Sequence, residues 1–227
     1  MRDPCSARSV AGRRWWEWEP VFRLDGRRAA LLIVDMQNGF VQPGAPLEVP
    51  MARAQVPVIR TLLDFWRSRD LPVVFTAFCV APDFRYPFYW AIARQRGLDL
   101  EPPTALFSEG RPETAIVAEL APRPGEPVIR KCGYDAFAHT ELEAVLRGQG
   151  VGDLVIVGTV VNWCVDSTVR GAFHRFFNVA VVADAVSGYD HAGATGEQWC
   201  QLELDLFAEA FARVLTAEQV MAELAAA

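Results

Sequence analysis

Lysine is almost absent from this chain. Of its 227 residues, 22 are Lys or Arg, and Lys131 is the only lysine among them. Arg fills every other cationic position, including the neighbouring Arg130, so a surface cation has evidently been encoded as Arg. A lysine kept against that bias indicates a site that needs a compact ammonium rather than a wide planar guanidinium. Chance is the alternative, because a single lysine has to stand somewhere.

Basic charge and long apolar runs are also scarce. The 28 acidic residues leave a net charge of −6, so no basic field exists to attract phosphates. No apolar run reaches the roughly 18 residues that a membrane span needs. The first residues, MRDPCSARSVAGRRWWEWEP, lack the apolar region of a secretory signal. We therefore expect a cytoplasmic protein with neither nucleic acid nor membrane as a partner.

Cysteine and histidine occur without the spacing of a disulfide framework or a zinc site. No CxxC is present among the five cysteines, which are Cys5, Cys79, Cys132, Cys164 and Cys200. This usage is typical of a reducing compartment. The pairings at i, i+2 or i, i+4 that bind zinc are missing among the histidines, which are His139, His174 and His191. We therefore expect no metal and no cofactor.

The chain is organised as an arm followed by one domain. Residues 1–28 are rich in Arg and Trp and show no periodicity, so we predict an N-terminal arm docked on its own body or on a neighbouring subunit. From Ala29 to the end at 227, apolar β-forming runs alternate with helical segments. The expected strands cover 29–34, 72–78, 126–130, 153–158, 178–184 and 213–215. The expected helices cover 51–69, 113–120, 139–149, 164–177 and 195–211, with a last one from Thr216.

This alternation predicts an α/β fold. We expect a three-layer αβα sandwich around a six-stranded, mainly parallel, Rossmann-like sheet. The stretch 80–112 is rich in proline and aromatic residues and is interpreted as an irregular lid or binding loop.

Three chemically versatile residues follow expected strands, where ligands bind in such sheets. Asp35 ends the first strand, Lys131 the third, and Cys164 lies just past the fourth. Cys164 falls in the first turn of a helix, where free amides and the helix dipole favour a thiolate. Asp35 follows a buried strand and could be tuned as a general base. The structural alternatives are a small buried hydrophobic residue for Cys164 and a helix cap or turn acid for Asp35.

Three motifs contain these residues: DMQNGFVQPGAPLEV, RKCGYDAFAHTELEAVLRGQGV and GTVVNWCVDSTVRGAF. As an ordered set they resemble the isochorismatase-like cysteine hydrolase superfamily. The Cys–Val–x–Ser–Thr–x–Arg run and the Lys–x–x–Tyr pair are most similar to ureidoacrylate amidohydrolases. The resemblance implies a catalytic triad of Asp35, Lys131 and Cys164. It also implies an oxyanion hole formed by the backbone amides of Val160 and Cys164, and a cis peptide between Thr159 and Val160.

Two departures narrow the activity that the resemblance implies. Nicotinamidases of the superfamily carry an Asp–x–His…His metal site that is absent here, and true isochorismatases, which cleave an enol ether, lack the cysteine. We therefore expect a metal-independent amidohydrolase that cleaves a C–N bond of a small amide or ureido compound through a covalent intermediate on Cys164. The alternatives are an isochorismatase-like enol-ether hydrolase and a non-catalytic oligomeric scaffold of the same fold. The partners are then a small-molecule substrate and further copies of the chain, as a dimer or tetramer.

The substrate pocket is predicted from the segment 83–90, which packs five aromatic residues around Arg85. The segment is interpreted either as a lid over the strand ends or as part of the core or a subunit interface. As a lid, it places Arg85 to bind a substrate carboxylate with two parallel hydrogen bonds, and Trp90 to form a wall for a planar substrate. Tyr134 and Asn162 are then expected to bond the amide or ureido end.

Overall fold

The chain folds around one parallel sheet. This computed structural model describes residues 18–81, 87–100 and 105–226. The strand order is β3-β2-β1-β4-β5-β6, and every neighbouring pair is parallel. The strands are β1 (Ala29–Val34), β2 (Val73–Phe78), β3 (Val128–Lys131), β4 (Asp153–Thr159), β5 (Asn178–Ser187) and β6 (Arg213–Leu215). The predicted six-stranded α/β architecture is confirmed.

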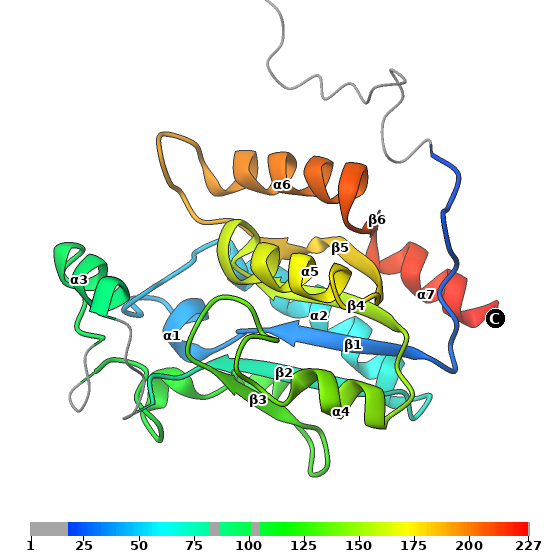
Figure 1. Cartoon of the computed structure of the whole chain (residues 1–227), viewed down its shortest axis with the longest axis horizontal. Helices are drawn as coiled ribbons and strands as arrows, with labels where there is room; N and C mark the ends of the chain where they lie inside the picture. Colours follow the sequence, from blue (N-terminus) through cyan, green and yellow to red (C-terminus); the bar gives the residue numbers. More distant parts are fainter. Residues whose placement is uncertain (1–17, 82–86, 101–104, 227) are drawn as a thin grey trace, which may run out of the picture.

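Helices cover both faces of the sheet (Figure 1). One face carries α2 (Ala52–Arg67) and α7 (Ala217–Ala225); the other carries α4 (Leu142–Gly148), α5 (Asp166–Phe173) and α6 (Gly196–Ala210). The short helices α1 (Asn38–Val41) and α3 (Pro87–Gln95) lie at the end toward which the β1 arrow points.

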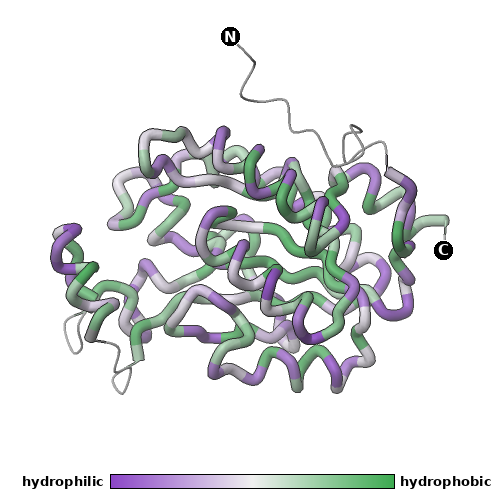
Figure 2. The backbone as a smooth tube through the Cα atoms, turned by 45° about the horizontal axis from the view of Figure 1, so that its top comes forward, coloured by the Kyte–Doolittle hydropathy of each residue, from purple (hydrophilic) through white to green (hydrophobic). Residues whose placement is uncertain are grey.

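The strands are apolar throughout because both of their faces are buried. In β1 the side chains of Leu31 and Ile33 pack beneath α2, while those of Leu32 and Val34 pack beneath the helices opposite. A strand buried on two sides needs apolar residues at every position rather than at every second one. Figure 2 shows the consequence, with hydrophobic strands through the middle of the molecule.

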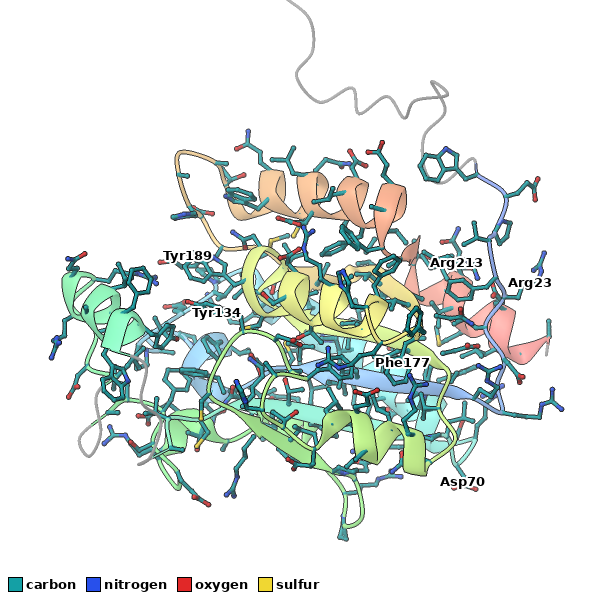
Figure 3. All side chains as sticks on the ribbon, viewed as in Figure 1. Arg23, Asp70, Tyr134, Phe177, Tyr189 and Arg213 are labelled. Atoms are coloured by element: carbon teal, nitrogen blue, oxygen red, sulfur yellow. The ribbon has the colours of Figure 1, made fainter. Side chains whose placement is uncertain are left out.

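The described part of the N-terminal arm docks on the chain's own C-terminal elements. Arg213 Nη1 donates a 2.8 Å hydrogen bond to the carbonyl of Phe22, and the amide of Leu24 donates one of 2.6 Å to Glu223 Oε1. The Leu24 side chain is buried, and Figure 3 places Arg23 beside Arg213 at this end of the molecule. The rest of the arm, including Trp15 and Trp16, lies outside the described residues, and the domain boundary at 28/29 stays a prediction.

Two predictions about local structure were wrong. The stretch 80–112, expected to be irregular, contains α3, because Pro87 stands at the first helical position, where its missing N–H costs nothing. The helix expected over 113–120 is two short 3₁₀ turns, Pro112–Thr114 and Ala118–Leu120. Between them the backbone is extended because Ile116 bridges to Gln37 and the Val117 amide bonds to the Met36 carbonyl.

A half-buried carboxyl between α5 and α6 makes stability depend on pH. Burial and the nearby Asp166 raise the pKa of Glu203 to about 7. Arg170 lowers this pKa only partly, because its guanidinium forms an ion pair with Asp166, with Nε 2.6 Å from Oδ1. Because the folded-state pKa lies above the unfolded one, the folded state binds the proton more tightly. Glu203 therefore stabilises the fold most below the unfolded pKa, and this contribution is lost as the pH rises through about 7.

We expect Glu203→Gln to raise the melting temperature near pH 8 by a few degrees, corresponding to about 1 kcal/mol after discounting for partial exposure. Near pH 4 the effect should vanish, since the glutamate is then protonated in both states. Thermal unfolding at the two pH values measures this difference. Glu209→Gln, an exposed change on the same helix, is the matched control. An equal effect of Glu203→Gln at both pH values would refute the assignment.

Candidate active site

The predicted site residues meet where the sheet topology reverses. From β1 the chain proceeds to β2 and β3 on one side, then returns to β4 on the other side of β1. Asp35 directly follows β1, Lys131 is the last residue of β3, and Cys164 lies five residues beyond the end of β4 at Thr159. The carboxyl ends of these parallel strands lie at one edge, which is where α/β sheets bind ligands.

Asp35 and Lys131 form a buried ion pair. Lys131 Nζ lies 2.7 Å from Asp35 Oδ2, and at most 1% of either side chain is exposed. The ammonium also donates a 2.9 Å hydrogen bond to the Gly133 carbonyl. Burial alone lowers the pKa of Lys131, but the interactions of its ammonium with Asp35 and Cys164 outweigh burial and raise that pKa overall. Lys131 therefore carries its positive charge throughout the neutral range.

The Cys164 thiol completes this cluster. It interacts with both Lys131 and Asp35 and is itself buried. Burial raises the pKa of the thiol to about 12, and Lys131 offsets only part of this shift. Burial and the nearby Asp35 thus oppose the thiolate that the helix start was expected to favour, and Lys131 supports it. A thiol whose pKa is raised needs a base to take its proton before the sulfur can act as a nucleophile.

The Cys164 backbone belongs to a tight turn after β4. The Thr159–Val160 peptide bond is cis. A π-helical turn over Val161–Val165 replaces the first part of the helix expected over 164–177, and α5 follows it. The Val160 carbonyl accepts hydrogen bonds from the amides of Trp163 and Val165, each 3.0 Å long. The turn therefore folds back on Val160 and brings the Cys164 backbone close to it.

Gly158 lets this turn approach β1. Its φ is +115°, and a Cβ at this position would lie 2.1 Å from the carbonyl oxygen of Val34. Any side chain would separate the ends of β1 and β4 or distort the backbone. The glycine thus keeps Asp35, the residue after Val34, next to the turn that carries Cys164.

Two polar residues that sequence reasoning missed hold the Asp35 region. Thr76 Oγ1 donates a 2.6 Å hydrogen bond to Asp35 Oδ1 and accepts one of 3.2 Å from the Asp35 amide. Gln37 Nε2 donates 2.9 Å bonds to the carbonyls of Phe78 and Thr114, and Gln37 Oε1 accepts a 2.8 Å bond from the Phe78 amide. The signal for Thr76 was present, because it is the one polar residue in the buried strand VVFTAF.

Thr76 is therefore a positioning residue for the carboxylate. We expect Thr76→Val to lower kcat by about 10–100-fold with little change in KM, the effect of losing one hydrogen bond to a charged group. Thr76→Ser keeps the hydroxyl and should restore most of the rate. Steady-state kinetics of the two variants test this, and a Thr76→Val enzyme with wild-type kcat would show that the bond does not matter.

A cleft opens above Cys164. It contains about 690 Å³ of unfilled space, part of which is open solvent. Its lining is mostly apolar and aromatic: Phe40, Leu47, Val49, Phe78, Tyr89, Ile92, Ala93, Arg96, Leu98, Leu100, Tyr134, Val160, Trp163, Cys164 and Tyr189. Figure 3 shows Tyr134 and Tyr189 at the end of the sheet that faces α3. One face of α3, which carries Tyr89, Ile92 and Ala93, forms the outer wall together with Arg96, which directly follows the helix.

Of the residues predicted to contact the substrate, the structure places some in the cleft lining and others outside it. Tyr134 lines the cleft, with its ring centroid 5.8 Å from that of Tyr89 and 5.3 Å from that of Trp163. Trp90 lies on α3 but packs against the core and does not line the cleft. The Asn162 side chain donates a 3.2 Å bond to the Tyr189 carbonyl and accepts one of 3.2 Å from the Tyr189 amide. We therefore revise its role to holding Tyr189 in the wall. Arg85 lies outside the described residues.

Comparison with known proteins identifies the family. The model of the isochorismatase domain matches residues 29–219. The chain belongs to the isochorismatase family. Curated relatives include the ureidoacrylate amidohydrolases RutB of Caulobacter segnis and Methylobacterium radiotolerans. The first is 30% identical over 182 residues, covering 74% of this chain and 75% of that protein. The second is 31% identical over 202 residues, with coverages of 82% and 78%.

Solved structures of isochorismatase-like proteins share the fold. A cysteine hydrolase from Pseudomonas syringae pv. phaseolicola superposes with a TM-score of 0.82 at 24% identity, covering 92% of this chain and 98% of the other. N-carbamoylsarcosine amidase from Thermoplasma acidophilum gives a TM-score of 0.68 at 26% identity, covering 84% and 97%. The resemblance seen in the three motifs is thus confirmed, and this isochorismatase-family chain is a hydrolase.

Proposed function

We propose that this chain is a metal-independent cysteine amidohydrolase that cleaves a C–N bond of a small amide or ureido compound through a covalent intermediate on Cys164. The observation that carries this proposal is the buried cluster of a thiol, a carboxylate and an ammonium beneath a small cleft. The activities named for the relatives, on ureidoacrylate and N-carbamoylsarcosine, support a ureido or amide substrate.

In the first half of the reaction Asp35 acts as a base. Its carboxylate takes the thiol proton while the sulfur attacks the substrate carbonyl, so a C–S bond forms as the S–H bond breaks. The backbone amides of Val160 and Cys164 stabilise the resulting oxyanion, at about 3 kcal/mol per donor. Asp35 then gives the proton to the leaving nitrogen. The C–N bond breaks, an amine or ammonia departs, and an acyl or carbamoyl thioester stays on Cys164.

In the second half water replaces the nitrogen. Asp35 takes a proton from water, and the resulting hydroxide attacks the thioester carbonyl. As the C–S bond breaks, the sulfur regains its proton from Asp35, and a carboxylic or carbamic acid leaves. Lys131 stays charged throughout. Its ammonium holds the carboxylate in place at 2.7 Å and favours the developing thiolate by lowering the pKa of Cys164.

The proposal needs no metal. Within the described ranges, no group of three or more His, Cys, Asp or Glu side chains is arranged to hold a metal ion. We therefore expect exhaustive dialysis against a chelator to leave the specific activity unchanged within assay error. Assays before and after dialysis, with and without added zinc, check this. A loss of activity that zinc restores would contradict the metal-independent mechanism.

Ammonia release from a panel of small amides and ureido acids tests the proposed function. Hydrolysis of at least one compound by the wild type, and of none by Cys164→Ala, is the expected result. The scaffold alternative predicts no hydrolysis and no specific labelling of Cys164 by iodoacetamide. The enol-ether alternative predicts cleavage of an enol ether that persists in Cys164→Ala.

Assembly and location are further proposals. None of the helices in the described part of the chain is both long and apolar enough to cross a membrane. We propose that the chain forms a homo-oligomer, a dimer or tetramer, in the cytoplasm. Light scattering measures the assembly, and fractionation of the source cells measures the location.

A further inference from the structure

One charged side chain in the cleft is not used by the proposed reaction. Among the described lining residues, Arg96 alone carries a charge. It follows α3, whose C-terminus is closed by Gly97 at φ +73°. Arg96 Cζ lies 5.4 Å from the centroid of the Trp163 ring, and Trp163 precedes the proposed nucleophile.

Arg96 is itself exposed, but aromatic residues of the cleft lie beside it. Its charge acts on Tyr89 and Tyr134 by lowering their pKa values, although burial, the larger effect, raises both. These two tyrosines and Trp163 form the aromatic wall that runs from α3 to Cys164. No described carboxylate is ion-paired with the guanidinium. A charge beside low-dielectric walls attracts an anion more strongly than one in open water.

The net charge of the chain strengthens this interpretation. At −6, the protein as a whole repels anions, so a cleft cation that no described carboxylate neutralises opposes the overall field. A neutral substrate would gain no charge–charge attraction from the Arg96 guanidinium and would displace part of the water that hydrates it. A carboxylate would form charge-assisted hydrogen bonds with it and would orient the other end of the molecule toward Cys164.

We propose that Arg96 is the specificity-determining residue for a substrate carboxylate, so that the substrate is a small amide or ureido acid rather than a neutral amide. This inference rests on the proposed function and deepens it. The carboxylate binds at the α3 end of the cleft, and the scissile carbonyl lies over Cys164.

A pair of alkylating probes tests the inference without a known substrate. Iodoacetate and iodoacetamide have nearly the same size and the same leaving group, but only the first carries a carboxylate. The rate ratio of the two at Cys164, measured by peptide mass spectrometry, reports how strongly the cleft selects an anion. We expect Arg96→Gln to lower this ratio by at least about fivefold and Arg96→Glu to lower it further. Arg94→Gln, an exposed change in the last turn of α3, two residues before Arg96, should leave it unchanged.

Kinetics on a hydrolysed ureido acid and its methyl ester extend the test. Arg96→Gln should raise KM for the acid by at least about tenfold and leave KM for the ester unchanged. An alkylation ratio that is insensitive to Arg96, or an equal loss for acid and ester, would overturn the inference while the cysteine mechanism stands. If Cys164 reacts with neither probe, the proposed function fails, and the inference fails with it. If the ratio falls but no amide or ureido compound is hydrolysed, the anion subsite stands and the proposed reaction fails.

Discussion

Replacing Cys164 with alanine is expected to abolish turnover and to leave the fold intact. The sulfur is the only atom that the proposed chemistry attaches to the substrate, so kcat should fall by at least about 10³-fold, as when other covalent nucleophiles are removed. The change deletes one small buried atom and should cost only about 1 kcal/mol of stability. Ammonia release measures the activity, and thermal unfolding measures the fold. A folded variant with substantial activity would exclude the covalent route.

The matched control is Cys200→Ala. Cys200 on α6 is also buried, and burial also raises its pKa to about 12, but it is not in contact with the Asp35–Lys131 pair. This variant loses the same atom from a comparable environment and should keep its activity. A parallel loss in both variants would mean that the assay reports damage to the core rather than chemistry.

Lys131→Arg is expected to be nearly as damaging as Lys131→Met. The ammonium is buried, lies 2.7 Å from Asp35 Oδ2 and also bonds to the Gly133 carbonyl, so no room is left for a planar guanidinium. We expect a loss of at least about 100-fold in kcat for both variants, equivalent to about 2.7 kcal/mol or more. Lys131→Met also leaves Asp35 buried without its partner and should lower stability by roughly 3–5 kcal/mol.

Arg130→Lys is the control for Lys131→Arg. It exchanges arginine for lysine at the neighbouring position, where the exposed Arg130 side chain forms an ion pair with Glu109. Activity should stay within about twofold of wild type. Unfolding curves separate a lost fold from a lost reaction in each variant. If Lys131→Arg keeps more than about a tenth of the wild-type rate, a loss of under about 1.4 kcal/mol, the site does not need a compact ammonium.

The sequence carried those parts of the fold that depend on local pattern. The strands Ala29–Val34 and Arg213–Leu215 were predicted residue for residue. Short apolar runs of β-forming residues between helical segments indicate buried strands in an α/β fold. The meeting of Asp35, Lys131 and Cys164 followed from their places after parallel strands, because carboxyl ends lie at one edge. The rarity of lysine independently indicated that Lys131 belongs to a functional site.

What the sequence could not supply depends on contacts between distant segments. The hydrogen bond from Thr76 to Asp35 joins residues 41 positions apart, and no local spacing reveals it. The raised pKa of Cys164 comes from burial by the completed fold, which the helix-dipole argument left out. Asn162 holds a wall residue instead of facing the cleft, because Tyr189 returns beside it from the loop after β5.

The most direct test of the mechanism is the mass of Cys164 during turnover. Enzyme mixed with an amide or ureido substrate that it hydrolyses is quenched in acid within the first turnover and digested, and the peptide containing Cys164 is analysed by mass spectrometry. Cys164 should carry the acyl or carbamoyl group of the substrate, and the adduct should disappear as the substrate is exhausted. Product release in the first turnover with Cys164 unmodified, or with the group attached to another residue, would contradict the assignment of Cys164 as the nucleophile.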